Sequence, residues 1–113
     1  MLGINNLTIG GNLVKDPYVR ETASGEMVSF VVAINRRFFQ NDVAKEYTHF
    51  IPVKAWGKSA QVCKKLRKGD AVCVLGELAT FRPAAGEDAP ATHTEVYVKV
   101  RQLFTSPRKD MAA

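Results

Sequence analysis

The chain has 113 residues, of which 46% are hydrophobic and 24% charged, so one folded domain is expected and a disordered chain is excluded. Sixteen Lys and Arg residues against eleven Asp and Glu residues give a formal net charge of +5, which favours a polyanionic partner without identifying it. No apolar run approaches the roughly 20 residues that span a bilayer. The first residues lack the pattern of a secretory signal, so a cytoplasmic protein with no membrane contact is expected.

The first half of the chain predicts three strands. Residues 7–13 are mostly apolar and contain a Gly-Gly pair, which indicates a bend or a bulge. After a connection with a Ser-Gly turn, residues 27–39 are β-branched and aromatic, and they predict a long strand with a basic, aromatic end. Residues 40–46 are predicted to form a polar loop, and the third strand is predicted within 48–58.

One helix is predicted over 58–70. Its buried side would consist of apolar residues at close to three-residue spacing: Ala60, Val62, Cys63 and Leu66. Gly69 gives a natural stop, and the last turn would be basic, with Lys64, Lys65, Arg67 and Lys68. These cations are equally consistent with phosphate contacts and with a solvated cap on the helix dipole.

Two further strands are predicted after the helix. Residues 71–81 form the fourth, with a glycine in the middle that indicates another bend, and 82–91 have the composition of a loop. Residues 92–104 alternate as a fifth strand. Its inward face would carry Val96, Val98 and Val100.

The order of these elements predicts the fold class. Five strands, with one helix between the third and the fourth and glycines at the bends, describe an all-β protein, a small closed antiparallel barrel of the OB-fold type. An SH3-like barrel would lack this helix, and an immunoglobulin-like sandwich would need about seven strands. The barrel domain is expected over residues 1–105, with a flexible C-terminal end at 106–113.

The third predicted strand has two contrasting faces. One face is aliphatic and suits a core, whereas the other combines rings with a cation: Phe50, Lys54 and Trp56. The same combination recurs at two other strand ends, in Arg36, Arg37, Phe38 and Phe39 and in Phe81 and Arg82. Rings that stack on bases and cations that meet phosphates are what an unpaired nucleic-acid strand requires. The alternative is an interaction module whose rings lie in an oligomer interface.

No catalytic or metal-binding pattern accompanies these residues. The sequence contains no nucleophile elbow, glycine-rich phosphate loop or paired metal-binding carboxylate motif, so an enzyme is not expected. Cys63, Cys73, His49 and His93 do not have metal-ligand spacing, and each cysteine is expected to be a buried, reduced thiol. Neither a metal nor a cofactor is predicted.

Short motifs follow one another in a characteristic order along nearly the whole domain. They include Gly11, Asn12 and Leu13, then Asp16, Pro17 and Arg20, then Thr48, Phe50 and Trp56 to Lys58, then 66–69 and Val74, Gly76 and Leu78. Taken together, they resemble the bacterial single-stranded DNA-binding protein family. The resemblance implies an OB-fold that binds and protects single-stranded DNA during replication, recombination and repair, in the nucleoid and usually as a homotetramer.

The resemblance also implies particular binding residues. The base-stacking rings fall on Phe38, Phe50 and Trp56. A further stacking ring of the family falls near Pro83, and because a proline cannot stack like an indole, Phe81 is expected to replace it. The predicted DNA-binding residues are Asn12, Arg20, Arg36, Arg37, Phe38, Phe50, Lys54, Trp56, Lys58, Arg67, Lys68, Phe81 and Arg82.

Members of this family typically continue into an acidic tip that recruits repair and replication enzymes. The last residues here, SPRKDMAA, are basic, so such recruitment is not expected of the sequence as it stands. A tailless relative favours the alternative, a primosome-type accessory protein, which is also an OB-fold and is typically a dimer.

Overall fold

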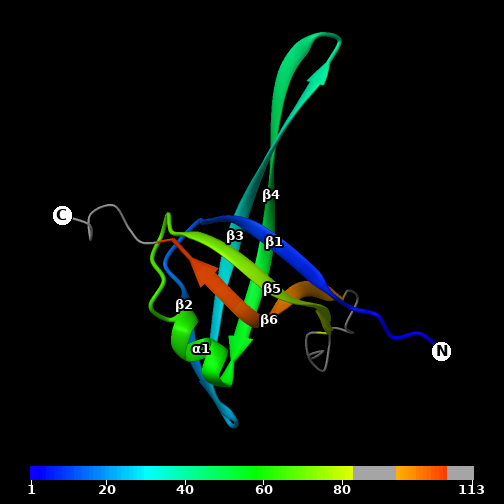
Figure 1. The fold of residues 1–113 in the computed structure, drawn as a ribbon. Helices are drawn as coiled ribbons and strands as arrows, with labels where there is room; N and C mark the ends of the chain where they lie inside the picture. Colours follow the sequence, from blue (N-terminus) through cyan, green and yellow to red (C-terminus); the bar gives the residue numbers. More distant parts are fainter. Residues whose placement is uncertain (83–93, 107–113) are drawn as a thin grey trace, which may run out of the picture.

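The computed structural model describes residues 1–82 and 94–106 (Figure 1). Apart from Arg82 and Ser106, the predicted loop at 82–91 and the predicted C-terminal end at 106–113 lie outside these residues. Within the described part of the chain, no helix is long and apolar enough to cross a membrane.

The chain forms six strands and one helix. The strands are β1 (Leu7–Leu13), β2 (Tyr18–Thr22), β3 (Gly25–Gln40), β4 (Val43–Trp56), β5 (Ala71–Phe81) and β6 (Glu95–Thr105), and α1 (Gly57–Cys63) lies between β4 and β5. The strand order is β1-β5-β6-β4-β3-β2, and β1 also pairs with β3. This last pairing closes β1, β5, β6, β4 and β3 into a five-stranded barrel, and β2 extends β3 outside it.

The predicted all-β OB-fold barrel is confirmed, with its helix at the predicted place. Two details differ from the expectation. The barrel is not wholly antiparallel, because β4 and β6 pair in parallel, with Val53 opposite Val98 and Lys54 opposite Lys99. In addition, the connection after β1 contains the short strand β2, which the sequence did not indicate because its side chains are nearly all exposed.

Glycines allow the barrel to close. At the end of β1, a Cβ at Gly11 would collide with the carbonyl oxygen of Ala33 on β3, so only glycine permits this approach. On β5, a Cβ at Gly76 would collide with the Lys99 carbonyl oxygen of β6, and the ladder between these strands shifts register between Leu75 and Gly76. The bends predicted at these glycines are therefore the places where strands change partner or register.

The core consists mainly of small aliphatic side chains from alternate strand positions. It contains Leu13, Val28, Phe30, Val32, Val53, Ala55, Val72, Val74, Val98 and Val100, together with Ala60, Cys63 and Leu66 from the helix and the turn after it. Two predicted core residues, Val62 and Val96, are instead half-exposed. Val96 precedes Val98, the first residue of β6 that pairs with β4, so the side chain of Val96 lies at the edge of the barrel.

The β3–β4 hairpin is much longer than predicted. Residues 40–46 are not a loop: the ladder continues to the pair Gln40 and Val43, and only two residues turn. Asn41 and Asp42 have φ angles of 51° and 62°, a left-handed conformation that Asn and Asp tolerate and that suits a two-residue hairpin turn. The hairpin consequently projects beyond the barrel as an arm (Figure 1).

The helix is shorter than the predicted span 58–70. It ends at Cys63. The N–H groups of Lys64 and Lys65 still donate to the Ala60 and Val62 carbonyls, and the chain then leaves the helical path. The N–H group of Lys68 donates to the carboxylate of Asp16 at 2.7 Å, and the N–H group of Gly69 donates to the Leu13 carbonyl at 2.9 Å. The basic residues after Cys63 are therefore not the last turn of a helix.

Stability at high pH is expected to depend on the thiol of Cys63. Burial raises the pKa of this thiol from near 9 to about 11. Below pH 9 the thiol is protonated in both states, whereas between these values it ionises more readily in the unfolded chain, so stability should fall as the pH rises through this window. Denaturant unfolding between pH 8 and about 11 measures the fall, which Cys63→Ala should reduce. Replacing the half-buried Cys73 with alanine is the control, and this variant should show the same fall in stability as the wild type.

Candidate functional site

One row of cross-strand neighbours runs across four strands on the outside of the barrel. Tyr18 of β2 lies opposite Ser29 of β3, Ser29 lies opposite Lys54 of β4, and Lys54 lies opposite Lys99 of β6. Residues directly opposite each other point to the same side of a sheet. We call the surface around this row the outer face, and it carries Tyr18, Arg20, Phe50, Lys54, Trp56, Phe81, Tyr97 and Lys99.

The predicted alternation along β4 is confirmed. Val53 and Ala55 are fully buried, Phe50 is 61% exposed, and Lys54 and Trp56 are half-buried on the same side as Phe50. The face that mixed rings with a cation is therefore turned away from the core.

Lysine ammonium groups lie over the rings of the outer face. The Nζ atom of Lys54 is 4.8 Å from the centre of the Tyr97 ring and 5.1 Å from the centre of the Phe81 ring. The Nζ atom of Lys99 is 5.7 Å from the Trp56 ring, and the Trp56 and Tyr97 ring centres are 6.0 Å apart. These distances are within cation–π range. Three strands thus bring rings and cations together in one cluster.

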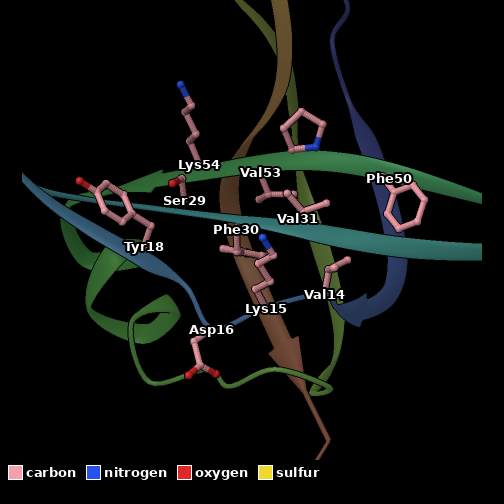
Figure 2. Close-up of a pocket in the computed structure, with 11 residues that line it drawn as sticks. Val14, Lys15, Asp16, Tyr18, Ser29, Phe30, Val31, Phe50, Val53 and Lys54 are labelled. Carbon is pink, nitrogen blue, oxygen red and sulfur yellow. The ribbon is translucent and has the colours of Figure 1, made fainter.

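A hollow of about 540 Å³ adjoins this cluster, between β4 and the connection that leads into β2. Phe50, Lys54 and Tyr18 belong to its lining, and Lys15 and Asp16 come from the connection (Figure 2). The rest of the lining is mainly apolar, with Val14, Phe30, Val31, Pro52 and Val53 beside Ser29.

The predicted cluster at the end of β3 is divided between the two sides of the hairpin. Arg37 alternates with its neighbours and lies on the side of the outer face, whereas Arg36 and Phe38 lie on the opposite side. Phe38 and Phe39 point to opposite sides of the strand, and both are exposed, at 38% and 79%. The arm projects beyond the barrel, so neither ring meets the core.

Several predicted binding residues make contacts that hold the fold. The side-chain amide of Asn12 donates to the Gly69 carbonyl at 3.1 Å, and the guanidinium of Arg67 donates to the Leu66 carbonyl at 2.8 Å. Both bonds fix the turn that follows α1. Arg20 lies on the outer face two residues after Tyr18.

The other predicted cations lie around the edges. Lys58, at the start of α1, lines a hollow of about 240 Å³ together with Arg101. Lys68 and Arg82 are exposed, the first in the turn after α1 and the second directly after β5. Pro83, where the family's further ring was placed, lies outside the described residues.

Lys64 is involved in a structural contact. Its Nζ atom lies 3.1 Å from a carboxylate oxygen of Glu26, which also accepts a bond from Gln61. The bond from Gln61 and the bond and charge of Lys64 lower the pKa of the Glu26 carboxyl below its usual value. This ion pair is a role that neither reading of the basic segment predicted, and through it Lys64 links the end of α1 to the start of β3.

Sequence reasoning did not identify Tyr18, Tyr97 and Lys99 of the outer face, nor Lys15 of the hollow that adjoins it. Tyr97 and Lys99 alternate with buried valines, so their outward direction was predicted, but not their position beside Lys54 and Trp56. Tyr18 had no signal of its own, because β2 was not predicted. Among the residues that the structure describes, no three His, Cys, Asp or Glu side chains gather where they could hold a metal ion.

Comparison with known proteins gives consistent matches. The model of the single-strand binding protein family matches residues 4–104. Single-stranded DNA-binding protein 2 of Chlorobaculum tepidum is 41% identical over 111 residues, which cover 94% of this chain and 74% of that protein. The single-stranded DNA-binding protein of Thermus thermophilus is 36% identical over 95 residues, so the chain matches 35% of its length.

Two solved structures have the same fold. A Plasmodium falciparum SSB in complex with ssDNA superposes with a TM-score of 0.79 at 16% identity, covering 95% of this chain and 98% of that one. The small single-stranded DNA-binding protein of Streptomyces coelicolor gives a TM-score of 0.68 at 22% identity, covering 89% of this chain and 93% of that one. At these identities the likeness concerns the fold alone.

Proposed function

Because this chain belongs to the single-strand binding protein family, we propose that it binds unpaired DNA strands without reading their sequence. The observation that carries the proposal is the outer face, where Phe50, Trp56, Tyr97 and Phe81 lie among the ammonium groups of Lys54 and Lys99. Rings of this kind stack on any base, and cations beside them neutralise the phosphates that connect the bases. The role is protection of exposed strands during replication, recombination and repair, in the cytoplasm and without catalysis.

Tryptophan fluorescence tests the proposal directly, because Trp56 is the only tryptophan of the chain. Addition of oligo(dT) should quench the emission, since a base stacks against the indole. Duplex DNA at the same phosphate concentration should quench it less, because its bases are already paired and stacked. If oligo(dT) leaves the emission unchanged and gives no shift in a gel, the proposal is wrong and the rings belong to an interface.

The same titration at several salt concentrations measures the phosphate contacts. The logarithm of the binding constant should fall with the logarithm of the salt concentration by about 0.7 for each phosphate neutralised on a single strand. Lys54→Ala should reduce this slope, whereas Lys64→Ala removes the same charge from a group that is paired with Glu26 and should leave it nearly unchanged. Equal slopes for the two variants would contradict a phosphate contact at Lys54.

We also propose that the protein assembles as a homotetramer. Joining several barrels lets one strand contact several outer faces, which raises the affinity without new contacts. Exposed apolar side chains away from the outer face, such as Phe104 on β6, support a further interface. Light scattering at micromolar concentration should give four times the mass of the chain, and a monomer would contradict the proposal.

A further inference from the structure

We infer that the hollow beside Phe50 is an additional base-binding site with Tyr18 as its far wall, so that the bound strand continues from β4 across β3 onto β2. The inference rests on the proposed function, which it extends from the ring cluster to a second part of the outer face. Tyr18 acts in it as a stacking ring.

The size and the lining of the hollow suit unpaired bases. Its volume of about 540 Å³ lies in the range of roughly 300–1,000 Å³ that is typical of pockets for small organic ligands. Apolar side chains, among them Val14, Val31 and Pro52, offer contact to the flat faces of bases, and the half-buried Ser29 adds one hydroxyl group. A base that leaves water for such a surface gains by burial of its faces.

The two rings stand far enough apart for separate bases. Tyr18 lies opposite Ser29, whereas Phe50 lies opposite Ala33, and these two partners are four residues apart along β3. At the rise of an extended strand this separation is about 13 Å. Figure 2 shows Tyr18 and Phe50 at opposite ends of the hollow. One base can therefore stack on each ring.

The charges around the hollow favour a DNA strand as its occupant. Lys15 and Lys54 both belong to its lining, so two cationic side chains border the path of the phosphates that connect the two bases. The carboxylate of Asp16, the one acidic group of the lining, accepts the backbone N–H of Lys68 at 2.7 Å. The hollow is also continuous with the ring cluster through Lys54, whose ammonium group contacts the Tyr97 and Phe81 rings.

Tyr18 is accessible for this role. This residue is 65% exposed, and β2 pairs with β3 alone. Its neighbour Val19 lies opposite the buried Val28 and points to the other side of β2. The two positions thus give a matched pair of substitutions on one strand.

The test combines affinity with cross-linking. The probe is an oligo(dT) in which thymine is replaced by 5-iodouracil at alternate positions, because this base cross-links to an aromatic ring stacked against it when irradiated. Mass spectrometry of the wild-type complex should find cross-links at Tyr18 as well as in the ring cluster. Tyr18→Ala should weaken oligo(dT) binding by about tenfold, the effect of losing one stacked base, whereas Tyr18→Phe and Val19→Ala should bind like the wild type.

The outcomes separate the inference from the proposed function. If the wild type does not bind oligo(dT) at low salt, the proposed function fails and the inference fails with it. If the wild type binds, while Tyr18→Ala keeps full affinity and no cross-link reaches Tyr18, the inference is overturned and the proposed function stands. Circular dichroism of both alanine variants shows whether β2 remains folded, and loss of affinity in Tyr18→Phe as well would show that stacking is not the cause.

Discussion

Replacing Trp56 with alanine is expected to weaken the binding of oligo(dT) by about tenfold or more. The indole belongs to the ring cluster, with the Tyr97 ring 6.0 Å away and the Lys99 ammonium group 5.7 Å away. Stacking of one base on an aromatic side chain contributes about 1–3 kcal/mol, which is lost when the ring is removed. Phe50→Ala should have an effect of the same order, because this ring is 61% exposed and serves no core contact.

Trp56→Phe is the matched control for this prediction. It keeps a flat ring at the same place, and the backbone of Trp56, which precedes the first residue of α1, is unchanged. Fluorescence anisotropy of a labelled oligo(dT) measures the affinity of each variant, since the Trp56 variants no longer report by their own emission. Wild-type affinity in both Trp56→Ala and Phe50→Ala, with unchanged thermal melting, would contradict the stacking assignment.

Gly11→Ala is expected to lower the free energy of unfolding by about 2 kcal/mol or more. The new Cβ would collide with the backbone carbonyl of Ala33, which belongs to the β3 ladder and cannot turn aside as a long side chain can. Overpacking of this kind typically costs about 1–3 kcal/mol, and here it acts where β1 closes the barrel onto β3.

Gly10 provides the control for this substitution. A Cβ at Gly10 would lie 3.7 Å from its nearest neighbour, the Val72 carbonyl oxygen, which is an ordinary contact distance. Gly10→Ala should therefore be neutral or slightly stabilising, since alanine orders more easily than glycine. Urea unfolding of both variants measures the difference, and equal stabilities would show that barrel closure does not depend on the small residue at Gly11.

The parts of the fold that the sequence predicted well are those with a buried side. β5 has the predicted bounds because Val72 and Val74 alternate with more exposed residues between two turns. The extension of the β3–β4 hairpin was missed because its residues have no buried face, so no period of two marks them. The helix was predicted too long because the acceptor for Lys68 is Asp16, a residue 52 positions earlier.

The same distinction explains what was predicted of the candidate site. Phe50, Lys54 and Trp56 lie on one strand, and alternation alone placed them on one face. Tyr97 and Lys99 join them through the parallel pairing of β4 and β6, and Tyr18 joins them through a row that crosses β3. No local pattern encodes such pairings, since they depend on which strands become neighbours when the barrel closes.

In the free protein, the ammonium groups of Lys54 and Lys99 cover ring faces of the outer face. If the outer face binds a strand as proposed, binding is an exchange: the ammonium groups of Lys54 and Lys99 leave the ring faces for phosphates, and bases stack on the faces that become free. An exposed cation–π contact contributes about 0.5–1 kcal/mol, less than the roughly 1–3 kcal/mol of a stacked base, so the exchange favours the bound strand. When the strand leaves, the same lysines can return to the rings, which keeps an unoccupied aromatic surface charged and hydrated and discourages it from adhering to other apolar surfaces.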